Sequence, residues 1–593
     1  MKTAVILLLS IAGQTLPQSP ARDVPASQVA GTAVISGQVV SEEDPAQPIR
    51  LAKVELSSSA LRRELMITTD SNGRFVFPRL AAGRYSLTVS KPGLMSTAYG
   101  AKRPGGAGVP IVVAEGEQLP VTVKMARGAV ISGTIRDANG EPAAGARLQV
   151  LSYGVDSSGA RTLQNRTFSN SGNGLLQTDD RGVYRIYGLR AGEYYIQASP
   201  TSSGSGGRAT SAAEIEWAQR AVAAAGGIPG APPPPGQSMA LAPVFFPGTP
   251  DPATAIPITL KAGEERTGVD FAIAFVPTAT VSGVIRGPDG SPPKLAQASM
   301  LRPNALVSTG NTFFIRPDAE GRFTVSNVAP GDYVLAARGS MQSSTDPAPG
   351  PMAIASMPLW AMTDVAVSGQ DISGLELKLA PGLTVSGKLV FQSEKTPVSV
   401  DLSKVSVSVL PQGPTSMGAP SVLAQADGTF VMPGVGPGEY RLTANVPAGT
   451  AATSPWALKS AIVNNIDAVD VPFSVRTDVG GAVITFTDRP TELTGSLLDT
   501  TGKPALEYFI VVFSVDRSFW TPQSRRIRSA RPGNTGSYRI AGLPPGEYHV
   551  CAMTDLEPSL LYTAGYLEPL VAASIKLTLA DGEKKAQDLK IAR

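Results

Sequence analysis

The stretch TTDSNGRFVFPRLAAGRYSLTV, residues 68–89, contains the pattern that decides the fold of this 593-residue chain. A turn rich in Asp, Asn and Gly comes first, because glycine tolerates the positive φ that tight turns require. The segment RFVF then alternates polar and apolar side chains, which is typical of a half-buried strand. Pro and Gly in PRLAAG end that strand, and Tyr85 begins the next one. The stretch therefore predicts a hairpin turn, a strand, a corner and a second strand.

The same order of residues occurs five times along the chain. In every copy an aromatic residue follows the turn glycine by two positions, a second glycine by ten and a tyrosine by twelve. Repetition with constant spacing indicates a tandem array of one structural unit. A shorter motif, SG or TG, precedes each copy, and successive occurrences of this motif are 96 to 150 residues apart. The turn glycines are Gly73, Gly182, Gly321, Gly428 and Gly536, and the tyrosines are Tyr85, Tyr194, Tyr333, Tyr440 and Tyr548.

These repeats predict an all-β protein, a tandem array of about five seven-stranded β-sandwiches of immunoglobulin-like form. The repeated tyrosine resembles the tyrosine corner of such sandwiches, in which the phenol binds the backbone of the preceding turn. Residues 200–240 form a Gly/Pro-rich insertion in the second module, and residues 212–225 within it predict a short helix. The expected module boundaries are 30–127, 128–277, 278–381, 382–490 and 491–593.

Residues 1–21 carry the features of a secretory signal peptide. Lys2 is followed by an apolar run from Ala4 to Ala12, and small residues come next. The alternative interpretation is a buried N-terminal strand. No other apolar run approaches the roughly 18 residues that a membrane span needs. The sequence therefore predicts a secreted protein, periplasmic or in the extracellular cell envelope, without a transmembrane span.

The charge balance argues against nucleic acid as a partner. Lys and Arg number 51, Asp and Glu number 48, and the net charge is +3. Nucleic-acid-binding domains carry a concentrated basic face instead. Gly and Pro are frequent, at 61 and 51 residues, which suits many short strands joined by turns.

The sequence offers little for catalysis or metal binding. His549 and Cys551 are the only histidine and cysteine, which excludes an intramolecular disulfide and the common His-rich or Cys-rich metal sites. The two side chains share one face of a predicted strand, so a Cys–His dyad is conceivable. A partly exposed histidine beside an inert thiol is the preferred interpretation. Turn aspartates such as Asp70 and Asp179 supply too few ligands for calcium. We therefore expect no enzyme activity, no cofactor and no metal site.

The repeated pattern resembles that of a known family. The motif TD-x-G-x-F followed by L-x-PG-x-Y, present with variations in all five copies, is similar to that of bacterial secreted proteins with tandem carboxypeptidase regulatory-like domains. The links 98–117, 245–265 and 516–528 resemble segments of the same family. The resemblance implies a prealbumin-like sandwich, grouped with the carbohydrate-binding-like folds, and it carries over nothing of a peptidase.

The fifth module contains the clearest candidate for a ligand-binding surface. Trp520 lies close in sequence to Arg525, Arg526 and Arg528. An exposed tryptophan stacks on the apolar face of a sugar, and arginine binds carboxylates and phosphates through two parallel hydrogen bonds. The alternative interpretation is Trp–Arg stacking on an ordinary hairpin. Aromatic residues in the links are further candidates, namely Tyr99, Phe245 and Phe246.

Two functional hypotheses follow. The first is a non-catalytic multi-module binding protein whose ligand is a polysaccharide or a cell-surface glycan, as the resemblance implies. The second is a structural stalk, adhesion or assembly protein with a protein partner and no small ligand. Clustered exposed aromatic side chains in one module favour the first, and regular contacts between modules favour the second. Trp360 and Trp456 precede late strands, and we expect them in cores or between modules.

Overall fold

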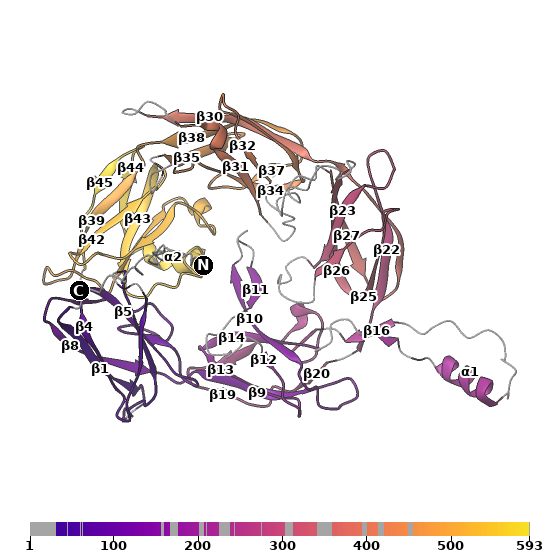
Figure 1. The fold of residues 1–593 in the computed structure, drawn as a ribbon, viewed down its shortest axis with the longest axis horizontal. Helices are drawn as coiled ribbons and strands as arrows, with labels where there is room; N and C mark the ends of the chain where they lie inside the picture. Colours follow the sequence, from indigo (N-terminus) through magenta and orange to yellow (C-terminus); the bar gives the residue numbers. More distant parts are fainter. Residues whose placement is uncertain are drawn as a thin grey trace, which may run out of the picture.

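The structure, a computed structural model, describes residues 31–591 except 44, 60, 62, 156–158, 160, 166–175, 201–206, 209, 211, 224–237, 242, 274, 303–311, 341–358, 394–399, 413–419, 449–453 and 455. The predicted signal peptide lies outside the described residues. Five β-sandwiches follow one another around a ring, and the fifth lies beside the first (Figure 1). The predicted all-β tandem array is confirmed.

Each sandwich repeats one arrangement of strands. In the first, β1 (Ala33–Ser41) is antiparallel to β4 (Arg74–Leu80) and parallel to the closing strand β8 (Gln118–Met125). This parallel pairing joins the first and last strands of the module, so the sandwich closes within its own segment of chain. The second sheet contains β2 (Lys53–Ser57), β3 (Leu65–Thr68), β5 (Gly83–Ser90), β6 (Thr97–Ala98) and β7 (Ile111–Val113).

The second and third sandwiches follow the same plan. In the second sandwich, one sheet contains β9 (Ala129–Arg136), β13 (Val183–Leu189), β19 (Glu265–Arg266) and β20 (Phe271–Ala272). The other sheet of this sandwich contains β10 (Arg147–Val155), β11 (Arg161–Asn165), β12 (Leu176–Gln177), β14 (Gly192–Ser199), β17 (Val244–Phe245) and β18 (Ile258–Leu260). A small separate sheet contains β15 (Gly207–Arg208), β16 (Ser238–Leu241) and β21 (Phe275–Pro277). The third sandwich has β22 (Ala279–Arg286), β25 (Arg322–Val328) and β28 (Ile372–Lys378) in one sheet, and β23 (Leu295–Leu301), β24 (Thr312–Ile315), β26 (Gly331–Ser340), β27 (Leu359–Val367) and β29 (Ala380–Pro381) in the other.

The fourth and fifth sandwiches vary the plan at their edges. The fourth has β30 (Leu383–Gln392), β33 (Thr429–Val435), β35 (Ala457–Val463), β36 (Ile466–Asp467) and β38 (Val479–Thr487) in one sheet, and β31 (Ser406–Pro411), β32 (Ser421–Leu423), β34 (Gly438–Asn445) and β37 (Phe473–Val475) in the other. The fifth has β39 (Glu492–Leu498), β42 (Ser537–Ala541), β45 (Lys584–Ala586) and β46 (Leu589–Lys590) in one sheet, and β40 (Phe509–Ser514), β41 (Ile527–Ala530), β43 (Gly546–Met553) and β44 (Ile575–Leu579) in the other.

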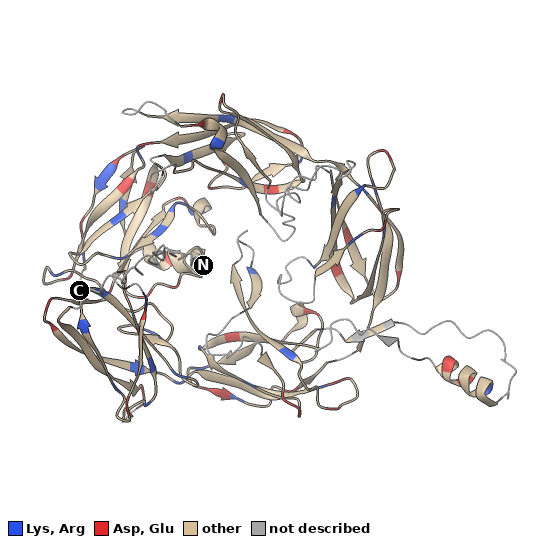
Figure 2. Ribbon diagram, in the orientation of Figure 1, with Lys and Arg blue, Asp and Glu red and all other residues tan. Residues whose placement is uncertain are grey.

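Each sandwich buries its own apolar core between its two sheets. The cores lie within residues 33–125, 129–273, 279–379, 385–486 and 493–589. Acidic and basic residues are scattered over all five sandwiches (Figure 2). The predicted module boundaries remain a prediction, since separate cores do not by themselves define where one folding unit ends.

The repeated tyrosine forms a tyrosine corner in every module, as the sequence predicts. In each case the phenol O–H donates to the backbone carbonyl oxygen of the residue four positions earlier in the corner. The five donor–acceptor distances are 2.8 Å at Tyr85, 3.1 Å at Tyr194, 2.9 Å at Tyr333, 2.9 Å at Tyr440 and 2.5 Å at Tyr548. The corner therefore fixes the turn between the two sheets in all five modules.

The glycine of the upstream SG or TG motif is required for a steric reason. A Cβ atom at Gly387 would lie 2.0 Å from the carbonyl oxygen of Ala482, and one at Gly495 would lie 2.0 Å from that of Gln587. Ala482 lies on β38, which runs parallel to the first strand of its module, and Gln587 lies between β45 and β46, which both run parallel to β39. Only glycine lets the two backbones approach this closely.

Two helices stand outside the sandwich plan. The first, α1 (Ala212–Ala223), is the helix predicted within residues 212–225, and it projects away from the ring (Figure 1). The second, α2 (Ala564–Val571), is not predicted by the sequence analysis and packs on the fifth sandwich. No helix within the described part of the chain is both long and apolar enough to cross a membrane.

Candidate functional site

Trp520, the centre of the candidate ligand surface, is buried. It is 7% exposed, and its indole Nε1–H donates to the carbonyl oxygen of Ser514 at 2.8 Å. Its ring meets that of Phe513 edge to face, with centroids 5.7 Å apart. The candidate ligand surface would require an exposed tryptophan, but α2 and its flanking residues build a second small core on this face of the sheet and cover Trp520. The stacking face that a sugar needs is not on the surface.

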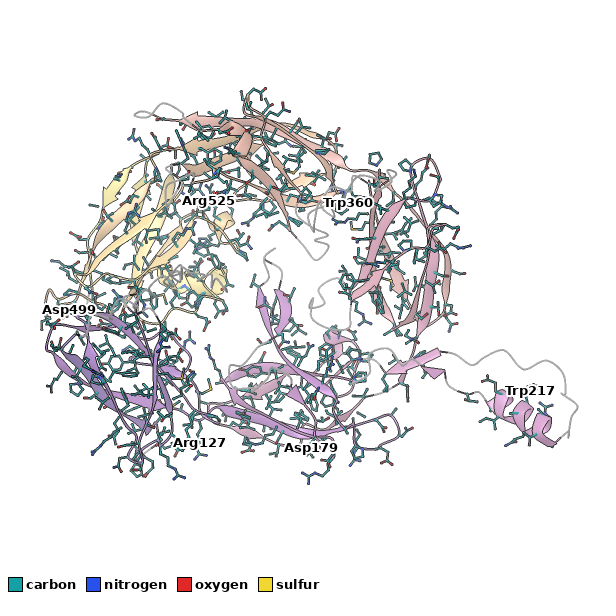
Figure 3. The ribbon with its side chains drawn as sticks, in the orientation of Figure 1. Arg127, Asp179, Trp217, Trp360, Asp499 and Arg525 are labelled. Carbon is teal, nitrogen blue, oxygen red and sulfur yellow. The ribbon has the colours of Figure 1, made fainter. Side chains whose placement is uncertain are left out.

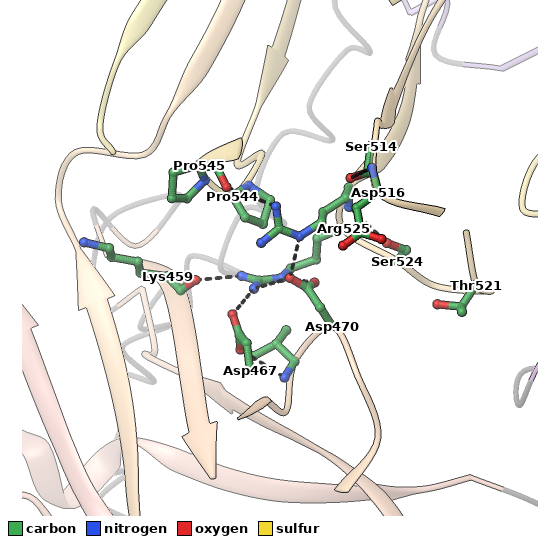
Figure 4. A network of polar contacts seen from close by, with 12 residues as sticks. Lys459, Asp467, Asp470, Ser514, Asp516, Thr521, Ser524, Arg525, Pro544 and Pro545 are labelled. Carbon is green, nitrogen blue, oxygen red and sulfur yellow. Dashed lines mark hydrogen bonds and ion pairs between the residues drawn. The ribbon is translucent and has the colours of Figure 1, made fainter. Parts of the chain in front are cut away.

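Arg525 is occupied by a contact between the fourth and fifth sandwiches (Figure 4). Its Nε and Nη2 donate to the two carboxylate oxygens of Asp470, at 2.9 and 3.2 Å. Nη2 also donates to Asp467 at 3.0 Å, and Nη1 donates to the carbonyl oxygens of Leu458 and Lys459 at 3.2 and 3.0 Å. The guanidinium therefore has the bidentate carboxylate partner expected of such an arginine, but the partner comes from the chain itself.

Arg526 belongs to the same junction. Its Nε lies 3.3 Å from Asp470 Oδ2, and its Nη1 donates to the carbonyl oxygen of Pro545 at 3.0 Å. The side chain of Asp470 is 0% exposed, so this carboxylate lies between two arginines without contact with water. Burial lowers the pKa of the neighbouring Arg441, and the negative charge of Asp470 opposes that shift. The junction is a buried network of charges.

The other candidates lie apart. Arg528 is exposed on β41. Tyr99 packs against the core of the first sandwich, whereas Phe245 is buried in a small cluster of the second. Phe246 is half-buried, meets Phe271 edge to face at 5.9 Å and precedes a cis proline. The structure does not bring these side chains together with Trp520.

Trp360 and Trp456 occupy the kinds of position that the sequence predicts. Trp360, on the third sandwich, donates from Nε1 to the carbonyl oxygen of Gly434 on the fourth at 2.6 Å. Trp456 is buried in the core of the fourth and packs edge to face on Phe391. Figure 3 places Trp360 and Arg525 near successive junctions of the ring.

His549 and Cys551 are buried rather than partly exposed, each at 4% exposure. His549 Nδ1 lies 2.6 Å from the hydroxyl of Ser574, and its ring stacks on Phe513. Burial lowers the pKa of His549 and raises the pKa of the Cys551 thiol to about 11. A reactive cysteine needs the opposite shift, so the pair lacks the electrostatics of a nucleophilic dyad. Among the described residues, no three or more His, Cys, Asp or Glu side chains are grouped so as to hold a metal ion.

The first and fifth sandwiches are joined by ion pairs that sequence reasoning missed. Arg103 Nε lies 2.7 Å from Asp555, and its Nη2 lies 2.6 Å from Glu557. Arg190 of the second sandwich reaches the same Glu557 at 3.4 Å and donates to the carbonyl oxygen of Gly105 at 2.9 Å. Three sandwiches therefore meet at one acidic loop. The partners are 452 residues apart in sequence, and no local pattern predicts such a contact.

Comparison with known proteins gives one family match and several remote structural similarities. No curated protein is significantly similar to the chain in sequence. A minor pilin of Streptococcus agalactiae is 14% identical, with 42% of this chain and 98% of that chain covered and a TM-score of 0.21. The major pilin subunit of Bacillus cereus is 11% identical, with 53% and 98% covered and a TM-score of 0.15.

The family match falls on the segment that contains the first repeat. The model of the carboxypeptidase regulatory-like domain matches residues 34–126. These residues contain β1 to β8 and the whole core of the first sandwich. The first sandwich of the chain is therefore similar to a carboxypeptidase regulatory-like domain.

Proposed function

We propose that the chain is a non-catalytic structural protein of the cell envelope or extracellular space, which holds five sandwiches in a fixed ring and acts through a protein partner. The observation that carries this proposal is that the candidate binding side chains contact other residues of the chain itself. Trp520 fills a core, and Arg525 and Arg526 bind Asp470 across a junction. These residues serve the architecture of the chain rather than an open ligand surface.

The junctions also explain why the ring has a defined shape. A buried carboxylate held by two arginines has its hydrogen bonds satisfied in one geometry, so a change in the angle between sandwiches exposes an unpaired charge. Separate sandwiches joined by peptide links alone would move relative to one another. A ring of fixed geometry presents its outer surfaces at set positions, which is what an assembly component requires.

A glycan-binding function receives less support. Sugar binding to sandwich modules uses exposed aromatic faces, and the aromatic side chains singled out by the sequence are buried or half-buried. We expect residues 22–593 to show no saturable binding to neutral or acidic polysaccharides in affinity electrophoresis. Saturable binding that survives Trp520→Ala would return the carbohydrate hypothesis to first place.

The partner hypothesis is tested in the native host. A tagged chain is crosslinked in intact cells and purified, with Asp470→Asn as the variant that disturbs a junction and Asp581→Asn as a control at an exposed ion pair. The proposal predicts one envelope protein recovered at constant stoichiometry with wild type and control, and less of it with Asp470→Asn. Recovery of the chain in the cytoplasm, or without a stoichiometric partner, would contradict the proposal.

A further inference from the structure

A polar pocket lies on the outer face of the second sheet of the first sandwich. Its volume is about 420 Å³, and Arg63 and Glu64 line it from the loop between β2 and β3. Arg84 of β5 lines it as well, together with Ser57 and Ser86, which are paired between β2 and β5. Because the alternate side chains of β5 are buried in the core, Arg84 and Ser86 face away from that core. Arg63, Glu64 and Ser86 are exposed, so a ligand reaches the pocket from solvent.

The pocket favours a ligand with a negative charge. Guanidinium and serine hydroxyl groups donate hydrogen bonds, and arginine binds a carboxylate through two parallel bonds. Within the described part of the chain, neither Arg63 nor Arg84 forms an ion pair with Asp or Glu. Glu64 also lines the pocket, but its carboxyl group is hydrogen-bonded to Glu55, which raises the pKa of Glu64. Glu55 in turn pairs with Lys53 at 3.2 Å, so the two guanidinium charges of the lining are left for a ligand.

The edge of the same sheet beside the pocket is open. β3 begins directly after Glu64, and within the described residues it pairs with β2 only. Thr69 N–H donates to the carbonyl oxygen of Ala52 at 3.0 Å. Because bonded and non-bonded positions alternate in an antiparallel pair, the backbone groups of Met66 and Thr68 point away from β2. The strand contains neither proline nor a charged residue, the features that commonly protect an edge from further pairing.

The pocket and the open edge together fit a polypeptide rather than a sugar. Among the described lining residues none is aromatic, whereas sugars bind on exposed aromatic faces. An extended peptide gains main-chain hydrogen bonds along an open edge, and a pocket beside the edge selects one of its side chains. The positive charge of this pocket selects Asp or Glu.

We propose that this corner of the first sandwich docks an extended acidic segment of the protein partner, whose backbone pairs with β3 and whose carboxylate binds Arg63 and Arg84 in the pocket. This inference rests on the proposed function, because it names the binding site for the partner that the proposed function requires. Arg84 also donates to the carbonyl oxygen of Pro532 on the fifth sandwich at 2.7 Å. The docked segment therefore lies beside the junction between the first and fifth sandwiches.

The first test measures the binding of a fluorescein-labelled peptide, GVDVDVDG, to residues 22–593 by fluorescence anisotropy. We expect saturable binding by wild type and a dissociation constant about tenfold higher in Arg63→Gln, because a charge-assisted hydrogen bond is lost. Arg74→Gln is the matched control, since Arg74 is exposed on the other sheet of the same sandwich. The analogue GVNVNVNG should bind about tenfold more weakly than the acidic peptide. Absence of saturable binding, or equal affinity in wild type, Arg63→Gln and Arg74→Gln, would overturn the proposal.

Pairing along the edge has a test of its own. Met66→Pro removes the N–H that points away from β2 and leaves the bonds between β2 and β3 in place, whereas Met66→Ala loses the same side chain and keeps this N–H. The peptide should bind about threefold or more weakly to Met66→Pro than to Met66→Ala, with equal circular dichroism of the two proteins. Equal affinity would contradict pairing along β3. Arg63→Gln, a substitution in an exposed loop, tests the pocket even if Met66→Pro fails to fold.

The crosslinking experiment in the native host separates this inference from the proposed function. With Arg63→Gln, less of the envelope protein should be recovered than with Arg74→Gln. Full recovery with Arg63→Gln would mean that the partner binds elsewhere on the ring, so the proposed function stands and the docking site is wrong. If no stoichiometric partner is recovered even with wild type, the proposed function fails, and the assignment of the pocket to that partner fails with it.

Discussion

Asp470 is the residue that holds both arginines of the junction between the fourth and fifth sandwiches. Its two carboxylate oxygens accept hydrogen bonds from Arg525 and Arg526, and its side chain has no contact with solvent. A buried ion pair of this kind adds little net free energy compared with an apolar contact, but the loss of one partner leaves a buried charge uncompensated. The value of Asp470 therefore lies in fixing the junction rather than in strengthening it.

Asp470→Asn is expected to destabilise the fourth and fifth sandwiches by about 3 kcal/mol, because two arginines lose their shared carboxylate. Urea unfolding followed by tryptophan fluorescence measures the change, since Trp456 and Trp520 lie in these two sandwiches. Asp581→Asn removes an exposed carboxylate that pairs with Lys459 at the same junction, and its effect should stay below about 1 kcal/mol. Equal effects of the two substitutions would show that burial of Asp470 has no special importance.

His549 makes the stability of the fifth sandwich depend on pH in a direction that its surroundings determine. Burial, and then the charge of Lys576, lower the pKa of His549 below its usual value. The unfolded chain therefore binds a proton at a pH where the folded chain does not, and stability present above about pH 6.5 is lost as the pH falls toward the lowered pKa. His549 is the only histidine in the chain, so no other histidine side chain changes its charge in this range of pH. We expect the melting temperature of the fifth sandwich to fall between about pH 7.5 and about pH 5.5, and to fall less in His549→Gln. Identical pH slopes in the two proteins would contradict this assignment.

Among the elements, the first strand of each module is constrained by the closing strand beside it. Gly387 on β30 faces the backbone of β38 so closely that a Cβ would overlap the carbonyl oxygen of Ala482. Gly387→Ala should therefore destabilise the fourth sandwich by about 1–3 kcal/mol, the usual range for overpacking a closely packed site. Gly480→Ala on β38 is the control, because the nearest atom to its Cβ is a serine hydroxyl at 3.8 Å. Urea unfolding compares the two, and the prediction fails if Gly387→Ala is as stable as Gly480→Ala.

The same elements show which parts of the fold the sequence determines locally. The turn glycines, the alternating strands and the corner tyrosines act over about a dozen residues, and each prediction from them is confirmed. Trp520 illustrates the opposite case, because its burial depends on α2, which lies more than 40 residues further along the chain. The sequence around Trp520 and Arg525 has the composition of a binding surface. Only the contacts with α2 and Asp470 show that it is used for packing.

For the whole molecule, charged contacts at the acidic loop of the fifth sandwich join it to the first and second sandwiches. Arg103 pairs with Asp555 and Glu557, and their side chains retain 24% to 32% exposure. Partly exposed ion pairs are weakened by dissolved salt. A closed ring at low salt should therefore shift toward open forms at high salt, in contrast to the buried junction at Asp470.

Arg103→Ala removes both ion pairs at once and should open the ring without unfolding any sandwich. We expect the radius of gyration from small-angle X-ray scattering to increase, while circular dichroism stays unchanged, because Arg103 lies outside the core of the first sandwich. Arg127→Ala is the control, since Arg127 forms an exposed ion pair with Glu43 within the same region of the chain. If Arg103→Ala keeps the scattering of wild type, closure must rest on the remaining contacts of this junction, of which the bond from Arg84 to Pro532 is the first to remove. A double variant, Arg103→Ala with Arg84→Gln, then decides whether the charged side chains hold the first sandwich to the fifth.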